Sequence, residues 1–158
     1  IKLENGLDTI GNYAFANCRN IQSIDLDIGS MISVIGDHAF YNCQSLKSYV
    51  MPKQVTKLGD SAFEKCTELK SIELCGNHSK VSLEKLGYDV FKDCSSLEGI
   101  TFPESLEENI DISMFEGCES LKYIAVKNNK INLVTGEGLN DSFGFEEFKA
   151  VVPESFYV

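Results

Sequence analysis

Residues 35–52 read IGDHAFYNCQSLKSYVMP, and residues 58–74 read LGDSAFEKCTELKSIEL. Aligned on their Ala-Phe pairs, both stretches place Cys three residues after Phe and Leu six residues after it. The same spacing returns around Phe15, Phe91 and Phe115, with Ile or Leu at the sixth position. Because the apolar positions keep their phase through five units, the sequence predicts a stack of similar coils, that is, a solenoid.

The unit length is nearly constant. Successive Phe residues of the pattern are 25, 23, 28 and 24 residues apart, and the extra residues of the long interval fall in a polar loop at 75–80. We expect residues 1–127 to form about five coils preceded by a partial first coil. Residues 128–158 lose the phase, and we expect them to form a degenerate last coil or a C-terminal cap. Since both ends read as incomplete, the chain is expected to be a piece of a larger protein.

Each unit predicts a short parallel strand, because inward apolar residues alternate with polar ones. The expected strands, at residues 21–26, 46–51, 69–74, 97–102 and 121–126, should stack in register. Pro52 and Pro103 would end two of them by removing an amide donor. Residues 59–66 carry the small-plus-aromatic spacing of one or two helical turns on the far side. The expected fold class is therefore α/β, with a parallel sheet on one face and short helices or turns on the other.

The repeated order resembles the BspA-like class of bacterial leucine-rich repeats over roughly residues 1–127. Single coils depart from that pattern through Asp111 at a glycine position, Tyr49 at an isoleucine position, and Asp27, Cys75 and Lys127 at proline positions. The resemblance implies a right-handed, curved leucine-rich repeat solenoid with its sheet on the concave face. It also implies a segment of a larger bacterial cell-surface or secreted protein used for adhesion.

Composition excludes several classes of function. The chain has 158 residues, 43% of them hydrophobic, and a net charge of -10 from 14 Lys+Arg against 24 Asp+Glu. An acidic chain without a run of basic residues repels nucleic acid and anionic headgroups. No apolar run reaches the roughly 18 residues of a membrane helix, so we expect no membrane insertion of this segment.

Six cysteines raise the question of disulfides and metals. Five of them occupy the same point of successive coils, where stacked strands lie about 4.8 Å apart with parallel Cα–Cβ vectors. A disulfide needs a shorter Cβ separation and inclined vectors, so we expect buried free thiols. Cys75 is out of phase, and we expect it to be exposed. There is no Cys-x-x-Cys pair and His occurs only at positions 38 and 78, so no metal or cofactor is expected.

Catalysis is not expected either. Nucleophilic chemistry needs a base beside a Ser or Cys, with a third group orienting that base. His38 and His78 are the obvious bases, and His38 stands at a variable turn position. Carboxylate pairs such as Glu107 with Glu108 are a natural product of an acidic composition, so the sequence predicts that the chain is not an enzyme.

What remains is a surface. Side chains between the inward residues of the strands should form a ladder on the concave face, the kind of extended surface that solenoids use for binding. Tyr123 is the expected anchor, because aromatic residues dominate interface energetics. The predicted protein-binding residues are Ser23, Asp25, Ser48, Val50, Ser71, Glu73, Thr101 and Tyr123. Two hypotheses stay open: a module that binds a host or neighbouring-cell protein, and a structural spacer without a ligand of its own.

Overall fold

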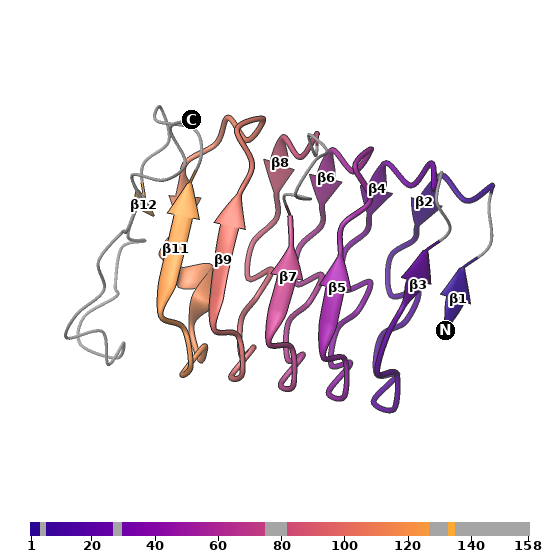
Figure 1. Ribbon diagram of the computed structural model, residues 1–158, viewed down its shortest axis with the longest axis horizontal. Helices are drawn as coiled ribbons and strands as arrows, with labels where there is room; N and C mark the ends of the chain where they lie inside the picture. The colour runs from indigo at the N-terminus through magenta and orange to yellow at the C-terminus, as the bar shows by residue number, and fades with distance from the viewer. Residues whose placement is uncertain (4–5, 27–29, 75–81, 127–132, 135–158) are drawn as a thin grey trace.

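The computed structural model describes residues 1–3, 6–26, 30–74, 82–126 and 133–134, the last two as backbone only. Within these residues the chain winds into a solenoid in which every pair of neighbouring strands is parallel. Figure 1 shows the strands in two rows, one in front of the other, with the chain passing from the front row to the back row and returning in each coil. The predicted parallel solenoid is confirmed for these residues.

The longer strands form what we call the front sheet, which faces the viewer in Figure 1. Its strands, in the order β11-β9-β7-β5, are β5 (Ser48–Val50), β7 (Ser71–Glu73), β9 (Gly99–Phe102) and β11 (Tyr123–Val126). All four lie within predicted strands. Chain turns begin at the two prolines, where Val55 donates to the Pro52 carbonyl at 3.1 Å and Leu106 to the Pro103 carbonyl at 3.3 Å.

The first coil departs from the prediction of one continuous ladder. Its strand, β3 (Asp25–Leu26), pairs with β1 (Lys2–Leu3) in a separate two-stranded sheet instead of with β5. The next coil is joined to it just before the strands, where the Lys47 amide donates to the Gln22 carbonyl at 3.2 Å. The front sheet therefore ends at β5.

A second ladder, which we call the back sheet, was not predicted. It contains β2 (Thr9–Ile10), β4 (Val34–Ile35), β6 (Lys57–Leu58) and β8 (Lys85–Leu86) in that order. The corresponding strand of the next coil, β10 (Ile110–Asp111), pairs with β12 (Leu133–Val134) in its own two-stranded sheet. The in-phase apolar residue before each glycine marks these strands in the sequence, but two residues are too short for a strand pattern to be recognised.

The segments that lead from the back sheet to the front sheet are turns rather than helices. Among the described residues the only helix is η1 (Ile112–Phe115), a 3-10 helix, so the expected α/β class and the series of convex helices are not supported. Two residues of a typical turn have a positive φ, such as Ser61 at 53° and Lys65 at 61°. A left-handed residue stops helix propagation, so each segment closes into tight turns instead.

The turns of successive coils are joined by backbone hydrogen bonds. In the first coil, the amides of Tyr13, Phe15 and Asn17 donate to carbonyls of the next coil at 2.9, 2.8 and 2.7 Å. In the second coil, the amides at the corresponding positions donate to carbonyls of the third coil at 2.8 Å each, and they belong to His38, Phe40 and Asn42. Alternate amides therefore point along the solenoid axis, and this gives the turn side a ladder without regular strands.

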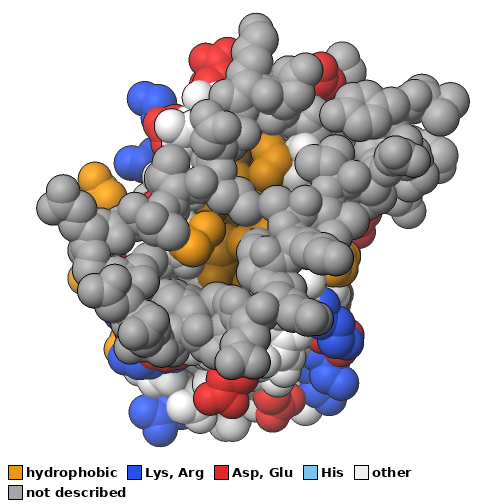
Figure 2. Space-filling model, turned by 90° about the vertical axis from the view of Figure 1, so that its left-hand side faces the viewer, with side chains coloured by type: hydrophobic (Ala, Val, Ile, Leu, Met, Phe, Trp, Pro, Cys, Tyr) orange, Lys and Arg blue, Asp and Glu red, His pale blue; other side chains and the backbone are white. Residues whose placement is uncertain are grey.

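The core consists of rows of one residue type. The Phe rings of neighbouring coils stack along the solenoid, with centroids 5.3 Å apart for Phe15 and Phe40 and 5.1 Å apart for Phe40 and Phe63. Ala62 and Ala39 are fully buried beside this stack. Seen from the β12 end in Figure 2, hydrophobic side chains gather at the centre and charged ones lie at the periphery. The prediction that Phe fills the core is confirmed.

Close approach between coils explains the repeated glycine. A Cβ on Gly59 would collide with the backbone nitrogen of Asp37 and the carbonyl carbon of Gly36, both in the preceding coil. The Asp37 carboxylate also accepts a hydrogen bond from the Asp60 amide at 3.0 Å. Asn12 and Asp60 make the same contact with the coil that follows each of them, at 2.8 and 2.9 Å. Because glycine has no side chain, the coils come close enough for the Asn or Asp side chain of one coil to accept a hydrogen bond from a backbone amide of the next. We call this contact a cap.

This arrangement also accounts for Asp111 at a glycine position. The residue that would cap its coil from the preceding one is Tyr88, which is 79% exposed and whose hydroxyl stands at the far end of a ring, whereas Asn12 and Asp60 carry their acceptor oxygens on short side chains. Asp111 instead caps its own coil, since its side chain accepts from the Ser113 amide at 2.9 Å and opens η1. The sequence departure therefore coincides with a change of turn structure.

Candidate functional site

The exposed side of the front sheet is the candidate site, and we call it the front face. Along β5 and β7 the side chains alternate, so that Ser48, Val50, Ser71 and Glu73 are exposed while the residues between them are buried. Register places Ser48 beside Ser71 and Val50 beside Glu73. Ser71 in turn is aligned with Gly99 of β9. Small residues thus form a continuous row across three coils.

At the β11 end an aromatic ring crosses this row. Tyr123 is aligned with Gly99, and a Cβ built on Gly99 would overlap ring atoms of Tyr123. The ring therefore lies over the glycine, with 43% of Tyr123 exposed. Two residues further along β11, Ala125 is buried. Thr101, which is aligned with Ala125 on β9, is half-buried. The front face consequently narrows from β7 towards β11.

The structure brings six of the eight candidate residues together. Ser48, Val50, Ser71, Glu73, Thr101 and Tyr123 lie on consecutive strands of one sheet. Ser23 and Asp25 are also exposed, but Asp25 belongs to β3, which pairs with β1. These two residues therefore border the front face and do not extend its ladder.

A row of charged residues along the front face was missed by the sequence analysis. Each front strand is preceded by an exposed residue, and these are Lys47, Lys70, Glu98 and Lys122. Their backbones are joined coil to coil, since Lys70 donates to Lys47 at 2.9 Å and Glu98 to Lys70 at 3.2 Å. The signal was present as repeated Lys-Ser pairs at 47–48 and 70–71, but only stacking makes the two lysines neighbours.

One ion pair lies within this row. The Lys122 ammonium contacts the Glu98 carboxylate at 2.8 Å, and this hydrogen bond, together with the charges of Lys122 and Lys70, lowers the pKa of Glu98. Within the described part of the chain, Lys47 and Lys70 have no carboxylate partner at ion-pair distance.

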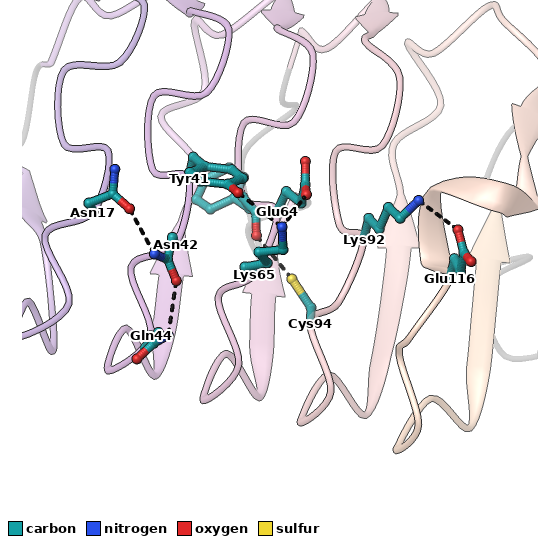
Figure 3. A network of polar contacts seen from close by, with 10 residues as sticks. Asn17, Tyr41, Asn42, Gln44, Glu64, Lys65, Lys92, Cys94 and Glu116 are labelled. Atoms are coloured by element: carbon teal, nitrogen blue, oxygen red, sulfur yellow. Dashed lines mark hydrogen bonds and ion pairs between the residues drawn. The ribbon is translucent and has the colours of Figure 1, made fainter.

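The turn side carries a network of polar contacts, which Figure 3 shows. Asn42 donates to the Asn17 side chain at 2.7 Å and accepts from Gln44 at 3.0 Å. Lys65 donates to the Tyr41 hydroxyl at 2.9 Å and contacts Glu64 at 3.3 Å. The contacts of Asn42 with Asn17 and of Lys65 with Tyr41 join adjacent coils and so stabilise the stack, while the other two lie within a coil.

The cysteines form an internal ladder of thiols. Cys18, Cys43, Cys66, Cys94 and Cys118 are free, and the prediction of buried free thiols is confirmed for all of them except Cys18, which is only half-buried. Cys75 lies outside the described residues. The Cys66 thiol donates to the Phe40 carbonyl of the preceding coil at 3.2 Å. Cys43, Cys94 and Cys118 donate in the same way at 3.1 Å, and this hydrogen-bonding role was not predicted.

Burial keeps these thiols protonated. It raises the pKa of Cys43 to about 11 and that of Cys118 to about 12. The pKa values of Cys66 and Cys94 are also raised, again chiefly by burial. A protonated, buried thiol is neither a nucleophile nor a metal ligand.

Within the described ranges, no three or more His, Cys, Asp and Glu side chains are grouped so as to hold a metal ion. His38 stacks on Tyr13 with ring centroids 4.7 Å apart and lies in a turn, and His78 falls outside those ranges. No helix of the described segments is long and apolar enough to cross a membrane.

Comparison with known proteins places this geometry in a family. The BspA type leucine rich repeat region matches residues 1–122 in six copies. No curated protein matches the chain. A leucine-rich repeat protein of T. pallidum is 28% identical with a TM-score of 0.68, covering 79% of this chain and 57% of its own.

Two further solved structures share the fold. The pneumococcal vaccine antigen PcpA is 25% identical with a TM-score of 0.72, covering 82% of this chain and 30% of its own. A leucine rich cell surface protein of Faecalibacterium prausnitzii is 23% identical with a TM-score of 0.63, covering 90% of this chain and 42% of its own. This chain thus spans between about a third and just over half of these three proteins. On the strength of the repeat match, the chain belongs to the BspA type leucine-rich repeat family.

Proposed function

We propose that this chain is a non-enzymatic protein-binding module of a bacterial surface or secreted protein, and that it engages its partner through the front face. The observation that carries the proposal is the pairing of exposed apolar groups with a row of small residues. Val50 is 59% exposed and Tyr123 is 43% exposed, at opposite ends of the Ser48–Ser71–Gly99 row. Such groups bind where a partner can approach closely and exclude water.

Membership of the family supports this assignment, since repeat solenoids present extended surfaces for association. The likeness to PcpA, described as a vaccine antigen, supports a surface or secreted location. A structural spacer is the second candidate, and the modest width of a four-stranded sheet favours it. Four strands spaced at about 4.8 Å span only about 15–20 Å, which suffices for no more than a standard interface.

The test compares two triple variants of the protein that carries this chain. The front-face variant replaces Tyr123, Thr101 and Glu73 by Ala. Its matched control replaces Tyr88, Thr9 and Glu84, three residues of the same types exposed away from the front face. Surface proteins captured by the unmodified protein are identified by mass spectrometry, and the affinity of each purified partner is then measured for both variants.

We expect the front-face variant to lose at least about tenfold in affinity, as hot-spot truncations do, while the control binds normally. Binding that survives the front-face substitutions would contradict the proposal. In that case the spacer function would be the better description of the coils.

A further inference from the structure

The row of charged residues beside the front strands is unbalanced. Lys47, Lys70, Glu98 and Lys122 follow one another on successive coils, so three ammonium groups share one carboxylate. That carboxylate is bonded to Lys122 at 2.8 Å. Among the described residues, Lys47 and Lys70 therefore have no carboxylate at ion-pair distance, and only the charge of Glu98 acts on Lys70 from the next coil. The two lysines lie on neighbouring coils, where like charges repel.

The ion pair at the other end of the row shows what these lysines can bind. Lys122 reaches across one coil to a carboxylate that an adjacent main chain presents. A carboxylate placed next to Lys47 and Lys70 by another polypeptide would meet the same donors in the same row. It would also remove the repulsion between the two ammonium groups.

Resting on the proposed protein-binding function, we infer that the front face recognises an extended acidic segment of its partner, which lies along the Ser48–Ser71 row with its carboxylates on Lys47 and Lys70. Glu73 borders the opposite side of the serine row, so the complementary segment carries its carboxylates along one side only. Side chains of an extended segment alternate, and acidic residues at every second position meet that requirement.

The net charge of -10 does not oppose this recognition at close range. Charges more than about 8 Å apart are largely screened at physiological ionic strength, so the nearest lysines dominate the contact. A polyanion such as a sulfated polysaccharide is a poorer match. It would need many basic groups to overcome the acidic remainder of the chain, and the row offers two unpaired ones.

The back sheet supplies a matched control. Lys57 and Lys85 are aligned neighbours on β6 and β8, are both exposed, and form a second pair of adjacent lysines. The variants to compare are Lys47→Gln with Lys70→Gln, and Lys57→Gln with Lys85→Gln. Both change the net charge equally, and circular dichroism and urea unfolding check that both remain folded.

The probe is a fluorescein-labelled decapeptide of alternating Glu and Ser, measured by anisotropy at 50 and 300 mM salt. We expect saturable binding that weakens with salt, falls at least about fivefold in the Lys47/Lys70 variant, and changes less than twofold in the Lys57/Lys85 variant. Any binding of a Lys-Ser decapeptide to the acidic chain should not weaken in the Lys47/Lys70 variant.

Three results would overturn the inference: no saturable binding at millimolar peptide, equal losses in both lysine variants, or lysine-dependent binding of heparin without binding of the peptide. The proposed function fails separately. If the Tyr123/Thr101/Glu73 variant loses its partner while the Lys47/Lys70 variant keeps it, the front face binds protein but not through acidic residues.

Discussion

The ring of Tyr123 occupies the space that a side chain on Gly99 would need, although the two residues are 24 positions apart in the sequence and belong to neighbouring coils. Glycine in a strand ordinarily costs stability, because it loses more conformational entropy on folding than other residues. Here it gives the aromatic ring a place to lie on the sheet. The register of β9 and β11, which aligns Tyr123 with Gly99, therefore determines where the ring lies on the front face.

Gly99→Ala should destabilise the protein by about 1 kcal/mol, because the new methyl group displaces the Tyr123 ring. In a Tyr123→Ala background the same change should stabilise it by about 0.5 kcal/mol, since the steric conflict is gone and the entropy gain remains. Urea unfolding of the four proteins in this cycle measures both signs. Equal effects in the two backgrounds would show that the ring and the glycine are independent.

Gly59→Ala and Gly11→Ala change equivalent positions of two coils. The Gly59 variant should lose about 2–3 kcal/mol, because its methyl group meets backbone atoms of the preceding coil that cannot move aside. Gly11 has no atom within 4 Å of the added Cβ, so its variant should stay within about 0.5 kcal/mol of the parent. Thermal or urea unfolding decides, and similar losses at both positions would contradict the close-approach explanation.

Tyr49→Phe should leave the protein as stable or raise its unfolding free energy by about 1 kcal/mol. The Tyr49 hydroxyl is buried and has no hydrogen-bond partner among the described residues, and its ring packs on Phe40 and Phe63 at 5.3 and 5.1 Å. Removing an unpaired buried hydroxyl removes a desolvation penalty. Tyr123→Phe, at an exposed ring, is the control. A loss above 1 kcal/mol for Tyr49→Phe would indicate a partner for the hydroxyl.

Alkaline pH should destabilise the fold through the thiol ladder. The pKa values of Cys43 and Cys118 are raised from 9.0 to about 11 and 12, so the folded state holds protons that the unfolded state releases. The stabilisation is complete below pH 9 and is lost as the pH rises through 11 to 12. We expect a loss of about 1 kcal/mol per buried thiol between pH 8 and 10, measured by urea unfolding.

Cys118→Ala provides the control for this pH dependence, because it should reduce the slope by one thiol while keeping the other three. If the unfolding free energy of the parent protein is constant from pH 8 to 10, the thiols are not buried as described.

The periodic core could be predicted from the sequence because burial of a side chain depends on its phase within the repeat, and Phe40, Cys43 and Leu46 keep that phase in every coil. The sequence predicted short helices or turns on the turn side and could not decide between them, because the left-handed residues that make the turns, such as Ser61 and Lys65, are not glycines. These conformations are held by hydrogen bonds to the next coil, from Ser61 to Tyr88 and from Lys65 to Lys92 at 2.8 Å.

The sequence by itself determined the repeat, the family, the inward-facing residues and the strands of the front sheet, because each follows from spacing within one coil. Tertiary structure alone decided which exposed residues become neighbours. Lys47 and Lys70 come together, Tyr123 covers Gly99, and β3 pairs with β1 and not with β5. Those relationships depend on how one coil is stacked on the next. A sequence pattern within single coils does not show which residues of two coils become neighbours.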